Sequence, residues 1–326
     1  MKCVARWLVL LAVLLAVPAV HADVKTRQRT QFKLEGILGG LVNVFGGKAA
    51  REGVTSTVAV KGSRKATTTE TTAQIIDLAE EKVYDVDLRR KEYKVTTFAE
   101  LRAQWEKAKA DAEKRAQEMK PEEKAEAEQA GRELELTADV KETGNTKSIA
   151  GHNTREVVLM ITGREKGRTL EEGGGFVMTS TMWLAPKIAA LDEQVQFDLK
   201  FFRAIYGEQF AQDMQQMVTA FALYPSLKPM MDKMRAEGGK LDGTPLHSTL
   251  TFEAVKSAEQ MKASQEQQQQ SGGGGLGGVL GRRIMGNKGQ PQQRTTVLTT
   301  ISETLLVEPA AADADVAIPA GFKEKK

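Results

Sequence analysis

Cysteine is almost absent from this chain of 326 residues, which contains one, Cys3. Cys3 lies within the first 22 residues, a segment that we expect to be removed after export. The rest of the chain therefore has no disulfide, no thiol nucleophile and no cysteine metal ligand. Cys3 also precedes the apolar run of this segment, so it is not placed as a lipid-attachment cysteine.

Histidine is scarce as well, and no familiar catalytic motif is present. Of the three histidines, His21 falls in the leader, while His152 and His247 stand too far apart for the close spacing of a histidine-based zinc site. The sequence has no HExxH, no GxSxG and no GxxxxGK[ST]. Asp85 and Asp87 share the expected solvent side of a strand, which disfavours a paired acid–base role. We expect a protein that is not an enzyme and uses no cofactor.

An excess of charge of one sign is also missing, because 46 Lys and Arg residues stand against 43 Asp and Glu residues. The basic residues are dispersed and are not interleaved with aromatics, which make up 6% of the chain. Such a balance gives no overall field for nucleic acid, so no nucleic-acid partner is expected.

The N-terminus reads MKCVARWLVLLAVLLAVPAVHA. Lys2 and Arg6 form a basic start, residues 7–17 are an unbroken apolar run, and Val20-His21-Ala22 offers small residues for cleavage. The run is shorter than the roughly 20 residues that span a bilayer. We therefore predict a signal peptide over 1–22 and a soluble periplasmic protein with no transmembrane anchor after cleavage. An uncleaved anchor is the alternative interpretation.

The remaining residues, 23–326, show alternating apolar and polar positions that favour β-strands. Polar or glycine-containing joints separate them, such as Gly62-Ser63, and predict antiparallel neighbours. In KVYDVDL, Tyr84, Val86 and Leu88 should face the core, and Val83 should lie on the solvent side with the two aspartates. The strands are expected at 24–34, 54–61, 64–71, 74–78, 82–88, 92–98, 134–140, 147–163 with a turn at Gly151, 175–185, 246–255 and 295–308.

Three insertions interrupt these strands. Residues 99–135 are rich in Ala, Glu, Lys and Arg and predict charged helices, with Glu113 and Lys114 exposed. Residues 191–238 predict apolar helices, and the Gly/Gln-rich segment 257–293 predicts a loop without regular structure. The order predicts one α+β domain with helical insertions rather than two domains.

Methionines and aromatics gather in the second helical insertion, where the spacing places most of them on one helix face. Met214 and Phe221 should face the sheet. The helix either caps the apolar face of the sheet or leaves a slot for an acyl chain or another apolar ligand, since methionine adapts to many shapes. The candidate ligand-binding residues are Phe210, Met214, Met217, Phe221, Met230 and Met234. Two glycine-rich apolar stretches, 36–47 and 272–286, are either loops that touch a membrane or disordered connections with no function of their own.

Several short stretches resemble periplasmic lipoprotein-carrier proteins (LolA/LolB-like), and more closely an uncharacterised periplasmic group with that scaffold. The matching parts are Lys61-Gly62-Ser63-Arg64, Ile76-Asp77, Lys91-Glu92-Tyr93, IAGHNTREV at 149–157, STMWLAP at 180–186 and VAIPAGFK at 316–323. The resemblance implies an open, strongly curved antiparallel β-sheet, a half-barrel, with helices on its concave face. In the carriers that cavity holds acyl chains.

We therefore expect a non-catalytic periplasmic protein that binds an apolar ligand, such as a lipid or an acyl chain, or an envelope partner. The partners expected are a lipid or a lipoprotein, and an envelope protein contacted through the helix at 99–135. The alternatives are a scaffolding envelope protein with no ligand cavity and a hydrolase of unrecognised type.

Overall fold

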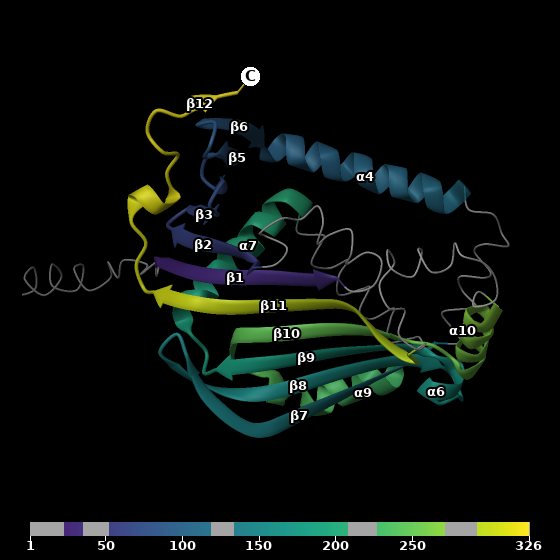
Figure 1. Ribbon diagram of the computed structural model, residues 1–326. Coiled ribbons are helices and arrows are strands. Elements are labelled where there is room, and N and C mark those ends of the chain that lie inside the picture. The colour runs from purple at the N-terminus through teal and green to yellow at the C-terminus, as the bar shows by residue number, and fades with distance from the viewer. Residues whose placement is uncertain (1–22, 35–51, 119–133, 208–226, 271–291, 326) are drawn as a thin grey trace, which may run out of the picture.

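The computed structural model describes residues 23–34, 52–118, 134–207, 227–270 and 292–325. They form an α+β fold around one open sheet of 12 strands, in the order β12-β6-β5-β4-β3-β2-β1-β11-β10-β9-β8-β7 (Figure 1). The α+β class and the open sheet that the sequence predicts are confirmed.

Most strand bounds lie close to those expected from the alternating pattern. The strands are β1 (Val24–Leu34), β2 (Val54–Lys61), β3 (Arg64–Thr68), β4 (Thr72–Asp77), β5 (Lys82–Asp87), β6 (Glu92–Thr97), β7 (Leu134–Ile149), β8 (His152–Glu165), β9 (Gly175–Ala185), β10 (Thr244–Val255), β11 (Arg294–Glu308) and β12 (Lys323–Glu324). The helices are α4 (Phe98–Glu118), α6 (Leu170–Gly173), α7 (Ala189–Tyr206), α9 (Lys228–Glu237) and α10 (Ala258–Gln270), with short 3-10 turns η1 (Gly238–Leu241) and η2 (Asp313–Val316).

In the order of the sheet, all neighbouring strands between β6 near one edge and β7 at the other edge pair antiparallel. The β2–β3 hairpin turns at Gly62, whose φ of +58° suits glycine. The short β12 instead pairs parallel with β6, through Lys323 opposite Glu92 and Glu324 opposite Tyr93. The sheet is therefore mixed, and the expectation of a wholly antiparallel sheet is wrong. The two paired residues of β12 are too few to give a pattern in the sequence.

Strands β2, β4 and β5 bury side chains on both faces of the sheet. Tyr84 and Val86 pack into one cluster with residues from the C-terminal segment, as expected. Val83 is only 5% exposed, because it packs with Phe98, Phe197 and other residues on the opposite face. Its predicted solvent position is wrong, because helical residues far away in the sequence cover that face.

Residues 309–325, here called the C-terminal strap, cross the face that carries Tyr84. Ala311 and Val316 are buried there, and the side chains of Ile318 and Phe322 pack against the same cluster. Lys25 Nζ lies 2.8 Å from Asp315 Oδ1 and ties the strap to β1. We call this side of the sheet the strap face.

Helices α7 and α9 lie on the opposite side, which we call the helical face. Gln194 of α7 donates a hydrogen bond to Thr26 Oγ1 on β1, and Phe32 lies on the same side of β1 as Thr26 by alternation. The strand register then places a row of residues in line across five strands: Phe32, Thr300, Leu250, Ser180 and Leu159. Leu159 packs in the same cluster as Met234 of α9, so both helices cover one side.

The insertions differ from expectation mainly at 257–293. There α10 forms over Ala258–Gln270, because Ala, Glu, Gln and Lys are good helix formers and the helix start is capped. The Gln260 backbone N–H donates to Ser257 Oγ at 3.1 Å, and the Ser257 N–H donates to Gln260 Oε1 at 3.0 Å. The prediction of a loop throughout is therefore wrong for these residues. The glycine-rich stretches at 36–47 and 272–286 lie outside the described residues.

Candidate apolar-ligand surface

Two neighbouring rows on the helical face are dominated by apolar side chains. One row crosses β1, β11, β10, β9 and β8 with an apolar residue on every strand: Leu34, Leu298, Phe252, Met178 and Ile161. The neighbouring row contributes Phe32, Leu250 and Leu159, with Thr300 and Ser180 between them. We call these eight apolar side chains the apolar platform.

The described residues leave the side chains of the platform partly exposed to solvent. Its side chains are half-buried, and Phe32 is 57% exposed. Large apolar side chains left facing water mark interaction or ligand-binding surfaces when they are contiguous. The position and the extent of the platform therefore fit a surface that an apolar molecule covers.

The row on the other side of the same strands is different in composition. Register places Lys33, Thr299, Thr251, Thr179 and Met160 in line there. Threonine satisfies the conformational preference of a strand while presenting a hydroxyl to water. Only one of these five residues, Met160, is apolar, whereas eight of the ten residues in the two platform rows are apolar.

An aromatic pair closes one edge of the platform. The rings of Phe176 and Phe252 stack with centroids 5.5 Å apart. Gly163 lies opposite Phe176 on β8, and a Cβ atom there would stand 2.3 Å from the Phe176 ring. Glycine inside β8 is therefore needed for Phe176 to lie against the sheet.

Helix α9 borders the platform at β8, and α7 lies against β1 and β2 on the same face. Met234 of α9 packs in a cluster with Leu159 and Met182. On α7, Val195, Leu199 and Phe202 follow one another at helical spacing and are all exposed. Helix α7 therefore carries an exposed apolar stripe as well.

The structure places two of the six predicted ligand-binding residues. Met234 reaches the platform, and Met230 lies one turn earlier on α9 and is half-buried. The predictions for Phe210, Met214, Met217 and Phe221 lie outside the described residues. Sequence reasoning missed the platform itself, although the alternation of Leu250 and Phe252 with threonines along 249–252 was a signal for it.

Three cavities bounded by described residues lie away from the platform. One of about 590 Å³ lies by the β7–β8 turn and is lined largely by polar residues such as Lys147 and Arg155. The others, of about 480 and 270 Å³, lie on the strap face around Lys25. Within the described residues the platform is thus an open surface beside the helices, and none of these three cavities is the apolar slot expected there.

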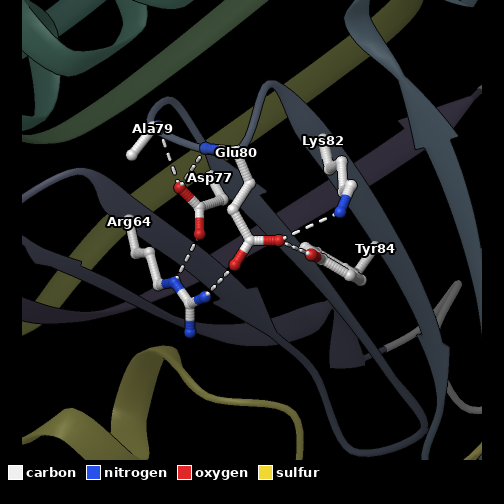
Figure 2. Close-up of polar contacts among 6 residues, drawn as sticks. All are labelled: Arg64, Asp77, Ala79, Glu80, Lys82 and Tyr84. Carbon is white, nitrogen blue, oxygen red and sulfur yellow. Dashed lines mark hydrogen bonds and ion pairs between the residues drawn. The ribbon is translucent and has the colours of Figure 1, made fainter.

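Arg64 and Asp77, from two of the resembling segments, meet in a polar network at the β4–β5 turn (Figure 2). Arg64 Nε donates to Asp77 Oδ2 at 2.6 Å, and the other oxygen of Asp77 accepts the backbone N–H groups of Ala79 and Glu80 at 2.9 and 3.0 Å. Arg64 also reaches Glu80, which accepts from Lys82 and from the Tyr84 hydroxyl at 2.6 Å. Each side chain of this network therefore has a partner within the network.

Burial alone would raise the pKa of Asp77, which is 2% exposed, but the two backbone N–H groups and Arg64 outweigh it and lower the pKa. Burial, followed by the hydrogen bond to Glu80, raises the pKa of Tyr84 to about 12. Asp77 is therefore a stable carboxylate and Tyr84 a stable phenol at neutral pH. Both are held for structure, because their contacts tie β3, β4 and β5 together.

The two histidines of the expected mature chain do not meet. His152 begins β8, whereas His247 on β10 lies opposite Trp183 and Glu303. Burial and nearby Lys147 lower the pKa of His247. In the part of the chain that the structure describes, no three His, Cys, Asp or Glu side chains gather as a metal site.

Comparison with known proteins gives no family or relative for this chain, because no family model and no curated protein matches it. Among the helices of the described residues, none combines the length and the apolar composition needed to cross a membrane.

Proposed function

We propose that this protein is a non-catalytic, exported binding protein that holds an apolar ligand, the acyl chain of a lipid or a lipoprotein, on the apolar platform. The observation that carries the proposal is the platform itself: eight apolar side chains in two rows, half-buried or exposed, on the helical side of an open sheet.

The dimensions of the platform suit a hydrocarbon chain. Five strands spaced by about 4.8 Å span roughly 19 Å from β1 to β8. An extended chain advances about 1.25 Å per carbon, given a C–C bond of about 1.5 Å. A single acyl chain of about 15 carbons laid across the strands would therefore reach from Leu34 to Ile161.

The resemblance to the lipoprotein carriers supports the same ligand. It implies a curved sheet that holds acyl chains on a concave, helix-covered face. An open sheet with α7 and α9 on one face agrees with the coarse part of this expectation. We propose that the helical face is the concave one and that the protein acts in the periplasm after cleavage behind Ala22.

Binding of a fluorescent long-chain fatty acid to the chain from residue 23 tests the proposal. Phe32→Ser should weaken binding about tenfold or more, because a buried Phe side chain contributes about 1.5–3 kcal/mol. Phe32 is 57% exposed in the structure, so the change should barely alter the unfolding midpoint.

Met160→Ser is the matched control. Met160 is 40% exposed and lies on the opposite side of the sheet, between Leu159 and Ile161 in sequence. The control should bind the probe as the unaltered protein does. Equal affinities of the Phe32 and Met160 variants, or no binding by the unaltered protein, would reject the proposal.

A scaffolding role is the second candidate, and α4 favours it. Every described side chain of α4 from 103 to 118 is exposed, including Glu113 and Lys114 as predicted, and Figure 1 shows the helix extending beyond the strands that precede it. A helix that packs so little of its surface is free to recruit an envelope partner. Pull-down from envelope extracts by the unaltered protein, but not by a variant with 103–118 replaced by a Gly/Ser linker, together with no fatty-acid binding, would favour this candidate.

A further inference from the structure

On the strap face, away from the platform, two hollows lie side by side. A chamber of about 270 Å³ lies between the strap and β1–β4, and a vestibule of about 480 Å³ lies beside it. Lys25, Thr57 and Thr68 line both, so the two hollows are neighbours that share these side chains as a common wall.

The chamber exists because small side chains stand where the strap crosses the sheet. Ala66 and Ala73 line it from the sheet, and Ala314 and Ala317 line it from the strap. Larger apolar side chains, Ile75 among them, complete the wall. The chamber is therefore suited to an apolar group of moderate size.

The vestibule presents charges of both signs. Lys25 is already paired with Asp315 at 2.8 Å. Arg27 and Glu308 also line it, and neither forms a hydrogen bond or a close ion pair with another described residue. Glu308 lies opposite Lys25, and Leu306 lies opposite Arg27. Arg27 and Glu308 are therefore diagonal neighbours on adjacent strands, a position at which Cα atoms are typically about 7–8 Å apart.

An apolar side chain is left open beside these charges. Leu306 lies directly opposite Arg27, lines the vestibule, and is 42% exposed. Thr57, the residue opposite Arg27 on β2, lines both the vestibule and the chamber. A ligand that covers Leu306 could thus meet both charges and place an apolar group under the strap.

We propose that this site binds a small zwitterion with an apolar side chain, that is, an apolar α-amino acid. Its carboxylate pairs with Arg27, its ammonium pairs with Glu308, and its side chain fills the chamber lined by the alanines. A ligand with only negative charge would meet Glu308 and Glu70 unfavourably, and a purely cationic ligand would meet Lys25 and Arg27.

Titration of the full chain from residue 23 with L-leucine and L-phenylalanine, followed by NMR chemical shifts, tests the proposal. Arg27→Gln and Glu308→Gln should each weaken binding about tenfold, because each removes one charge-assisted hydrogen bond. Lys33→Gln, an exposed lysine on the strap side of β1, is the matched charge control and should bind as the unaltered protein does.

Two further measurements separate the parts of the site. Ala314→Phe alters an exposed strap residue that lines the chamber, and should abolish binding without unfolding the protein. N-acetyl-leucine, which lacks the ammonium group, should bind at least tenfold more weakly than leucine. No binding by the unaltered protein at millimolar ligand, or unchanged affinity in both charge variants, would overturn the proposal. Equal affinity for the acetylated compound would also overturn it.

Discussion

Asp77 stabilises the β4–β5 turn through its hydrogen bonds. Its carboxylate is buried and accepts three hydrogen bonds, two from the backbone of the turn and one from Arg64. The sequence placed Arg64 and Asp77 in a resembling segment, but it could not show that they pair. The pairing depends on the β3–β4 register, which sets them opposite each other.

Asp77→Asn should lower the free energy of unfolding by about 2 kcal/mol, because the amide loses charge-assisted bonds inside a buried turn. Urea unfolding at pH 7 measures the difference. Asp85→Asn is the control, since Asp85 is exposed and its single side-chain bond, from Gln74, is exposed too; we expect a change under about 0.5 kcal/mol.

The same variant has a pH signature. The folded-state pKa of Asp77 is lowered, so its stabilisation is present above the unfolded-state pKa near 4 and is lost as the pH falls below it. Unaltered protein should therefore lose stability more steeply below about pH 4 than the Asn variant does. Parallel pH profiles of the two proteins would contradict this role.

At the scale of elements, strands that are specified by neighbouring residues in the sequence were predicted well. Strands β2, β4, β5 and β9 lie at or within about two residues of the expected ranges because alternation and turn residues are local signals. The middle of β7, residues 141–146, was missed, since the polar residues there give no alternation. The burial of Val83 and the parallel pairing of β12 depend on distant segments, which no local pattern reveals.

The strap should be essential for stability, because it buries Ala311 and Val316 and packs Phe322 against the sheet. A stop codon after Glu308 should lower the free energy of unfolding by more than about 3 kcal/mol, as expected when several apolar side chains of a core are removed. A stop codon after Phe322 removes only the residues of β12 and those beyond, and should cost under about 1 kcal/mol. Denaturation midpoints of the two truncated proteins measure both effects, and similar midpoints would contradict this role of the strap.

At the scale of the whole molecule, the sequence predicted an α+β fold with one open sheet, and the structure confirms it. The candidate site was only partly predictable: Met234 borders the platform, yet the platform residues were not named. They come from five strands, and only the register across all five shows that they share a face.

Native mass spectrometry of the protein, purified gently from its own envelope, tests the central claim most directly. We predict a polypeptide mass that begins at Asp23, together with a population carrying one lipid or acyl chain. In the Phe32→Ser variant that population should fall sharply. A clean mass without any lipid, in protein shown to be folded, would contradict the account.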